Sequence, residues 1–338
     1  MNPAAVYSKN LLLSAIQATA SDIHFCPSSN KTEIFFRVHG KRIFHQSIPK
    51  KQFETLLTYY KFTSGMDIGE KRKPQHGTIS FHTHHLQFSL RLSTLPVNTS
   101  ESLAIRLLPQ NDAHQLEQLF LFPNQLATIK SWISKRSGII LFTGPTGSGK
   151  TTTLYALLQS LLREQSFQTI TLEDPIEKEM SNILQVQVNE KAGITYNAGL
   201  KAALRHDPDI IMVGEIRDKE TAHFAFHASY TGHLVLSTLH AKDAVGTIHR
   251  LLEMGIKKTD LEQSLIAVAS LQLLPINTND FLPSRAAILE LLDKKLLHQV
   301  INQGSLEINE YFDSFDRLRR KAFAYGFSTK EVFNMVGK

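Results

Sequence analysis

The sequence is poor in cysteine, with Cys26 as the single one among 338 residues. One thiol excludes an internal disulfide and any zinc site built from several cysteines. Long apolar runs are also missing, and none approaches the length needed to cross a bilayer. The amino terminus predicts a short amphipathic helix whose apolar stretch is too interrupted for a signal peptide. These absences lead us to expect a cytoplasmic protein with neither a transmembrane segment nor zinc.

Charge of one sign is only slightly in excess: Lys and Arg number 37, Asp and Glu number 31, and the net charge is +6. This excess is compatible with nucleic acid, an acidic membrane face or an acidic partner, and equally with a modest charge spread over a large surface. The strongest basic run, from Arg317 to Lys321, lacks the interleaved aromatics of a platform that stacks single-stranded bases. We therefore expect no specific binding of nucleic acid.

The length and a hydrophobic fraction of 42% suffice for two ordinary domains. Residues 1–109 mix short strand patterns with helices, which predicts a small α+β domain. A polar break predicts a linker at 110–118. From 119 to 291, buried strand patterns alternate with helices, which predicts an α/β domain with a mostly parallel sheet. Residues 292–338 predict a short helical tail.

The segment Gly144–Thr151, GPTGSGKT, follows an apolar strand pattern and precedes a helical one. In this context the pattern G-x-x-x-x-G-K-[ST] binds nucleotide phosphates, because its glycines let backbone N–H groups converge at the positive end of a helix. Lys150 is expected to contact the β- and γ-phosphates, and the Thr151 hydroxyl to ligate Mg²⁺. The other predicted ATP-binding residues of this segment are Gly144, Pro145, Thr146, Gly147, Ser148, Gly149 and Thr152.

Acidic residues follow at the ends of later strand patterns, where ligands bind in open α/β sheets. Glu173 and Glu177 follow one strand, and Glu215 ends another, where such enzymes place a carboxylate on the Mg²⁺ side. His233 and His240 flank a further strand and are predicted to bind nucleotide and to act in catalysis, respectively. For His240 a hydrogen-bonded structural histidine and a γ-phosphate sensor stay equal alternatives. Several such strand ends beside one phosphate loop favour hydrolysis over binding alone.

Four motifs occur in order: GPTGSGKTTTLYA, ITLEDPIE, LRHDPDIIMVGEIRDKETA and TGHLVLSTLHAKDA. Together they resemble the Walker A, aspartate, Walker B and histidine boxes of the type II secretion and type IV pilus ATPases. The likeness covers roughly residues 21–291, through segments such as ASDIHFCP and LRLSTLP. It implies a RecA-like P-loop NTPase motor domain preceded by a small α+β, PAS-like domain, with ATP and Mg²⁺ as ligands and a homohexamer as the assembly.

The resemblance also implies roles for single residues. Glu173 and Glu177 match the aspartate-box acids that polarise water and help to hold the metal. Glu215 matches the Walker B glutamate, which binds Mg²⁺ partly through water. Arg91 and Arg106 match arginines that reach the nucleotide as the two domains close; the alternative for both is a salt bridge on a strand face. An arginine at the γ-phosphate accelerates hydrolysis about a thousandfold or more, so domain closure would gate the reaction.

Two departures narrow the choice within the family. The long export and pilus-extension motors carry a tetracysteine zinc loop and a further amino-terminal domain, which the cysteine count and the length do not allow here. Retraction motors carry an AIRNLIRE helix near the end, which LLDKKLLHQVINQG does not match. A short assembly motor without zinc resembles the competence-type pseudopilus ATPase, which supports DNA uptake.

We therefore predict an ATPase that drives assembly of a type IV pilus-like or competence pseudopilus. The resemblance implies that it acts on a polytopic membrane platform protein and associates peripherally with the inner face of the cell membrane. Three alternatives stay open: a DNA-translocating ring ATPase, a pilus retraction motor, and a non-catalytic nucleotide-binding scaffold.

Overall fold

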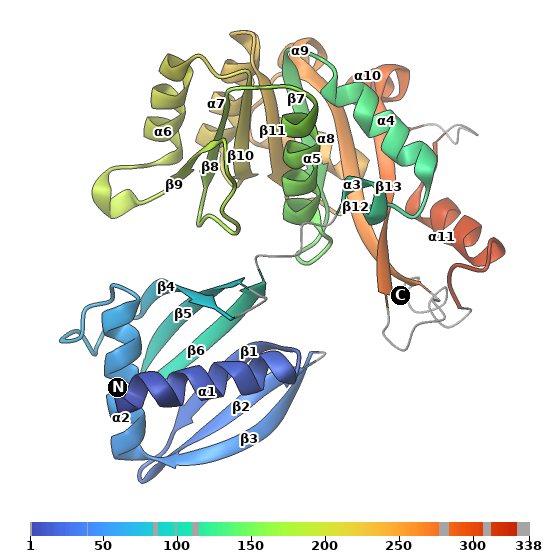
Figure 1. The fold of residues 1–338 in the computed structure, drawn as a ribbon. Helices are drawn as coiled ribbons and strands as arrows, with labels where there is room; N and C mark the ends of the chain where they lie inside the picture. Colours follow the sequence, from blue (N-terminus) through green and yellow to red (C-terminus); the bar gives the residue numbers. More distant parts are fainter. Residues whose placement is uncertain are drawn as a thin grey trace. The chain divides into compact units, whose positions relative to one another are not determined.

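The structure is a computed structural model that describes residues 2–38, 40–83, 87–98, 100–109, 115–276, 284–306 and 312–329. The chain forms two compact units, Met1–Ala113 and His114–Lys338, which are drawn in Figure 1. Residues 110–114 of the predicted linker lie outside the described residues. In the described part of the chain, no helix combines the length and the apolar character required to span a bilayer.

The first unit is an antiparallel sheet in the order β3-β2-β1-β6-β5-β4 (Figure 1). Because side chains alternate between the two faces of a strand, one face is apolar and buries Ile34, Phe36, Leu103 and Ile105. Side chains of α1 and α2 join the same hydrophobic core. The elements are α1 (Pro3–Gln17), β1 (Ala20–Pro27), β2 (Lys31–Val38), β3 (Lys41–Pro49), α2 (Lys50–Thr63), β4 (Gln75–His82), β5 (Gln87–Val97) and β6 (Ser100–Pro109).

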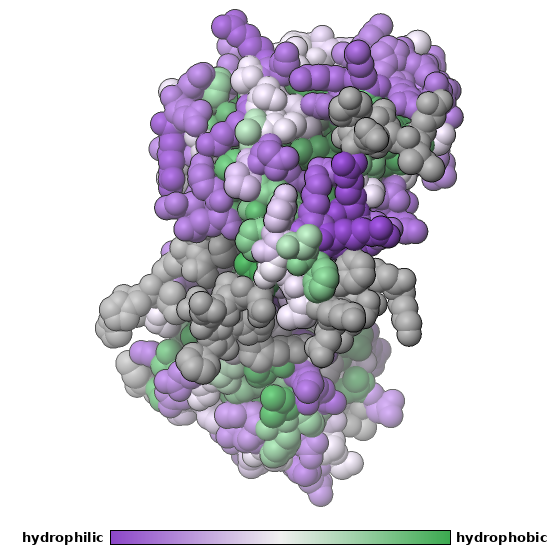
Figure 2. All heavy atoms as spheres, turned by 90° about the vertical axis from the view of Figure 1, so that its right-hand side faces the viewer, coloured by the Kyte–Doolittle hydropathy of each residue, from purple (hydrophilic) through white to green (hydrophobic). Residues whose placement is uncertain are grey.

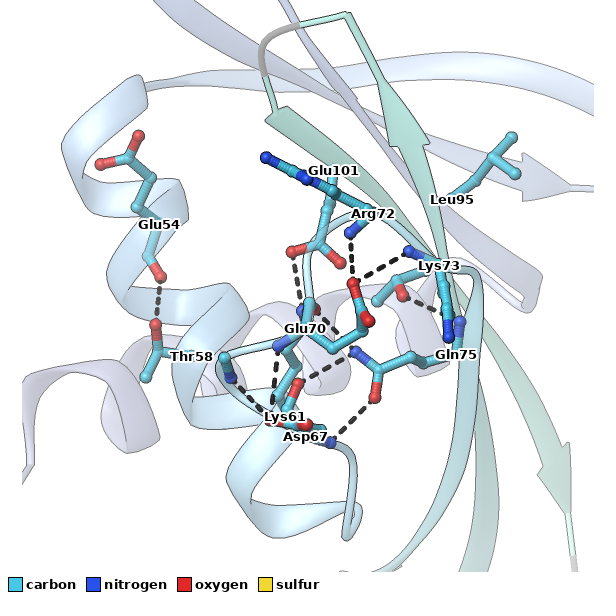
Figure 3. Close-up of polar contacts among 12 residues, drawn as sticks. Glu54, Thr58, Lys61, Asp67, Glu70, Arg72, Lys73, Gln75, Leu95 and Glu101 are labelled. Carbon is cyan, nitrogen blue, oxygen red and sulfur yellow. Dashed lines mark hydrogen bonds and ion pairs between the residues drawn. The ribbon is translucent and has the colours of Figure 1, made fainter. Parts of the chain in front are cut away.

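A buried ion pair fixes the loop between α2 and β4 (Figure 3). Lys61 Nζ donates to Glu101 Oε2 at 2.7 Å and to the backbone carbonyl oxygen of Glu70 at 2.7 Å. The side chains of Lys61 and Glu101 are only 2% and 3% exposed. The Gln75 amide nitrogen donates to the carbonyl oxygens of Asp67 and Glu70. Polar groups therefore hold this loop to α2 and β6.

The second unit contains a seven-stranded sheet in the order β13-β12-β7-β11-β10-β8-β9. Neighbouring strands are parallel except β12 and β13, which are antiparallel. The mostly parallel sheet predicted from the sequence is therefore present, with an antiparallel pair at one edge that the prediction did not include. The strands are β7 (Gly138–Thr143), β8 (Thr169–Glu173), β9 (Leu184–Gln187), β10 (Ile210–Ile216), β11 (Leu234–Leu239), β12 (Leu265–Ile276) and β13 (Ser284–Asp293).

Helices cover both faces of this sheet. Along β7, Ile139 and Leu141 enter one hydrophobic core, and Ile140 and Phe142 enter the other. On the face drawn in Figure 2, hydrophilic residues dominate the coloured surface of the second unit. The helices are α3 (Leu116–Leu119), α4 (Pro123–Ile133), α5 (Lys150–Glu164), α6 (Tyr196–Ala203), α7 (Lys219–Tyr230), α8 (Ala244–Glu253), α9 (Lys258–Ser264), α10 (Lys294–Gln303) and α11 (Phe315–Ala324).

Candidate nucleotide site

The glycine-rich loop connects the buried strand β7 to α5, in the context that the sequence predicts. Gly144, Gly147 and Gly149 have φ angles of 137°, 79° and 92°, which residues with a side chain rarely adopt. A Cβ at Gly144 would also lie 2.6 Å from the carbonyl oxygen of Leu271. No side chain caps the N-terminus of α5, which begins at Lys150. The loop therefore presents backbone N–H groups at the positive end of a helix, an arrangement that suits a phosphate.

Lys150 brings a positive charge to this loop and is only 7% exposed. Its Nζ donates to the carbonyl oxygens of Gly144 and Pro145 at 2.8 Å and 3.0 Å. Burial lowers the pKa of Lys150, and the negative charge of Glu215 opposes that shift. The buried Ser148 hydroxyl has no hydrogen-bond partner among the described residues. Among the described residues the ammonium group donates only to these neutral acceptors, so an anionic ligand in the cavity would pair with its charge.

A cavity of about 420 Å³ lies in the second unit between this loop and the carboxyl ends of β8, β10 and β11. Parallel strands end at the same edge of a sheet, which brings residues from distant parts of the sequence together. The predicted site residues that line the cavity are Thr146, Gly147, Gly149, Lys150, Thr151, Thr152, Glu173, Glu177, Glu215 and His240.

Three predicted site residues lie outside the loop and the cavity. His233 precedes the amino end of β11, where its Nδ1 lies 3.0 Å from the carbonyl oxygen of Ala228. The structure does not bring His233 to the loop, because the length of β11 lies between them. Arg91 and Arg106 belong to the first unit and face each other across β5 and β6. Arg106 donates to Asp22 there at 2.8 Å, and the role of both arginines at a nucleotide stays a prediction.

Glu173 ends β8 and is 3% exposed. Its carboxylate accepts hydrogen bonds from Thr171 at 2.6 Å, from Gln185 at 3.2 Å and from the Tyr155 hydroxyl. Burial raises the pKa of Tyr155, and the adjacent charge of Glu173 raises it further, so the phenol stays protonated. Three donors therefore hold the Glu173 carboxylate in place at the edge of the cavity.

Glu215 lies in a network of alternating charges. Arg217 donates to the carboxylate of Glu215 and, at 3.0 Å, to Oδ2 of Asp174. His240 Nε2 lies 3.5 Å from Glu215 Oε2. Burial lowers the pKa of His240, as does the charge of Lys150, so the ring is neutral at pH 7. The sequence analysis missed Arg217, although its spacing of two from Glu215 was a usable signal, because alternate residues of an extended segment share a face.

Gly214, the residue before Glu215, is packed closely against the end of β8. A Cβ there would lie 3.2 Å from the carbonyl oxygen of Leu172 and 3.4 Å from Cα of Glu173. We expect Gly214→Asp to lower the free energy of unfolding by about 1–3 kcal/mol, because it overpacks the site and adds a carboxylate beside two others. Denaturant unfolding measures this loss. Gly214→Ala shows the steric part alone, and an aspartate variant as stable as the wild type would contradict the close packing.

Comparison with known proteins assigns nearly the whole chain to one family. The model of a family described as type II/IV secretion system protein matches residues 1–317. The competence protein ComGA of Bacillus subtilis (strain 168) is 43% identical over 346 aligned positions, which cover 97% of this chain and 96% of that protein. The type II secretion system protein E of Klebsiella pneumoniae is 45% identical over 267 positions, which cover 78% of this chain and 53% of that longer protein.

Two solved structures share the fold. The Legionella pneumophila ATPase DotB has a TM-score of 0.78 at 21% identity and covers 98% of this chain and 95% of its own. The pilus retraction motor PilT, solved with bound ADP, has a TM-score of 0.75 at 26% identity and covers 96% and 94%. The predicted fold, a RecA-like α/β domain preceded by a small α+β domain, is thereby confirmed, as is the predicted family.

Proposed function

Since the chain belongs to the type II/IV secretion system protein family, we propose that it is an ATPase motor that drives assembly of a type IV pilus-like filament, a competence pseudopilus for DNA uptake. The observation that carries the proposal is the cavity in which the donors of the phosphate loop face Glu173 and Glu215. Similarity to competence proteins over nearly their whole length supports this choice of filament.

The loop side of the cavity would bind the phosphates of ATP. Backbone N–H groups of the loop would donate to phosphate oxygens. Lys150 exchanges the carbonyl oxygens of Gly144 and Pro145 for oxygens of the β- and γ-phosphates. Thr151 and Glu215 would hold Mg²⁺, in part through water, and the metal supplies Lewis-acid polarisation of phosphate oxygens.

Glu215 is the residue that we assign to proton acceptance. As the oxygen of the attacking water bonds to the γ-phosphorus, Glu215 accepts a proton from that water, and the bond from the γ-phosphorus to the bridging oxygen breaks to leave ADP and phosphate. Glu173 and Glu177 would polarise the water from the neighbouring strand end. His240, neutral and next to Glu215, would sense the γ-phosphate.

The resemblance to the family suggests that the proposed motor is a homohexamer, and a head-to-tail interface closes such a ring when its rotation divides a full turn. Arg91 and Arg106 would reach the nucleotide on domain closure, and the ring would act on a polytopic membrane platform protein.

Residues 1–113 contain 13 Lys and Arg against 7 Asp and Glu, whereas residues 114–338 contain 24 of each. The whole positive excess lies in the first unit, which suits the anionic inner face of the cell membrane.

Steady-state phosphate release with Mg·ATP tests this function. We expect the wild type to release phosphate and Glu215→Gln to lower kcat by at least about a hundredfold, since the proton acceptor is lost. Added double-stranded DNA should leave both rates unchanged. Strong stimulation by DNA with a steep salt dependence would favour DNA translocation instead. Binding of ATP with no phosphate release in any condition would favour a scaffold.

Pilus retraction is the second candidate, because the fold matches that of a pilus retraction motor along nearly the whole chain. Both motors hydrolyse ATP, so the assay above does not separate them. Deletion of the gene does: surface filaments are lost if the motor assembles them and accumulate if it retracts them. We expect their loss.

A further inference from the structure

Tyr196 lines the nucleotide cavity, and the mechanism above gives it no role. It is the first residue of α6, directly after the N-cap residue Thr195. Its hydroxyl oxygen is buried and has no hydrogen-bond partner within the described ranges. A buried polar group without a partner costs about 1–3 kcal/mol of stability. A phenylalanine at this position would fill the same space without that cost.

The hydroxyl lies on the carboxylate side of the cavity. It is 3.6 Å from the place that a Cβ on Gly214 would occupy, which is an ordinary contact distance, so the hydroxyl lies next to Gly214. Glu215 follows Gly214 directly, and the charges of Asp174, Glu215 and Glu173 all act on the phenol. The hydroxyl is therefore close to the residue that accepts the proton in the proposed reaction.

The phenol acts as a hydrogen-bond donor at neutral pH. Burial raises the pKa of Tyr196 well above its usual value, and the charges of Asp174 and Glu215 raise it further against the opposing charge of Arg217. None of these carboxylates accepts its proton in a hydrogen bond. A group that enters the cavity can supply the acceptor.

We propose that Tyr196 is a further catalytic residue, whose hydroxyl donates a hydrogen bond to the water that Glu215 deprotonates. This inference rests on the proposed ATPase function. In the attack, the water directs one proton at Glu215 and one lone pair at the γ-phosphorus. A water held by Glu215 alone still rotates about that hydrogen bond, and a donor to its second lone pair fixes its orientation. Glu173 does not supply this donor, because a carboxylate only accepts hydrogen bonds.

Tyr196→Phe tests this assignment because it removes only the hydroxyl. We expect kcat to fall about tenfold while KM for ATP and the Kd of a fluorescent ATP analogue stay unchanged, since the lost hydrogen bond is made to the water and not to the nucleotide. The melting temperature of the nucleotide-free protein should stay the same or rise, because the variant removes an unsatisfied polar group.

Tyr60→Phe is the matched control. Its hydroxyl is also buried, but it accepts a hydrogen bond from Ser8 at 2.9 Å in the core of the first unit. This variant should melt at a lower temperature than the wild type and keep its kcat.

An unchanged kcat in Tyr196→Phe would overturn the inference. A melting temperature lowered as in Tyr60→Phe would also overturn it, because the hydroxyl would then serve the fold. A wild-type protein that binds the analogue and never releases phosphate would instead overturn the proposed function, and the inference with it.

Discussion

Lys150→Ala is expected to reduce phosphate release by at least about a hundredfold. The variant removes a buried positive charge from the cavity and, in the proposed reaction, would leave the γ-phosphate without an ammonium partner. We also expect the Kd of a fluorescent ATP analogue to rise, because only the loop N–H groups would then bind its negatively charged phosphates. Phosphate release and analogue titration on the same preparation measure both effects.

Lys150→Arg keeps the positive charge at this position and changes the shape of the group that carries it. The ammonium group now fits between two carbonyl oxygens, whereas a planar guanidinium is larger and donates in a fixed fork, so we expect this variant to lose most activity too. The melting temperatures of both variants should stay close to that of the wild type, since water in the cavity can satisfy the freed carbonyl groups. Full activity in Lys150→Ala would show that this loop does not bind the reacting phosphates.

Lys61→Met is expected to destabilise the first unit by about 3–5 kcal/mol. The variant leaves the Glu101 carboxylate buried without its cation and removes the hydrogen bond that holds the carbonyl oxygen of Glu70 (Figure 3). Because this ion pair lies in the first of two compact units, hydrogen exchange of peptides from residues 50–109 measures the local loss of stability. The exchange rates of amide hydrogens in these peptides should rise by the factor that corresponds to the lost free energy of unfolding.

Two variants control for the role of burial. Lys31→Met breaks the exposed pair with Glu33, whose side chains are 56% and 37% exposed, and should cost less than about 1 kcal/mol. The double variant Lys61→Met with Glu101→Leu removes both charges and should recover most of the lost stability. If Lys61→Met and Lys31→Met lowered the free energy of unfolding equally, burial would not make the loss of the Lys61–Glu101 pair more costly.

The phosphate loop was predictable because its constraints are local. Three glycines at fixed positions take φ angles that other residues avoid, and the apolar run before them has the composition of a buried strand. The acids were predictable for a related reason: each ends a strand of a parallel sheet, and parallel strands end at one edge. Glu173 and Glu215 accordingly reach the same cavity from neighbouring strands.

The antiparallel edge of the second sheet was not predicted. β13 and β12 are apolar runs without clear periodicity, and such runs do not distinguish a buried strand from a buried helix. Pairing between the two strands, from Ala267 opposite Asp293 to Ile276 opposite Ser284, decides the conformation, and that pairing is a long-range property.

By itself the sequence determined the family and predicted the domain organisation and the residues proposed to hold phosphate, because these depend on motifs, strand patterns and their order. Only the tertiary structure decided which neighbours those residues have. Tyr155 donates to Glu173 and Tyr196 lines the cavity, although neither was predicted as a site residue, and Lys61 is buried although lysine favours the surface. Hydrogen-bond partners and burial arise from contacts between distant segments, so no local pattern of residues specifies them.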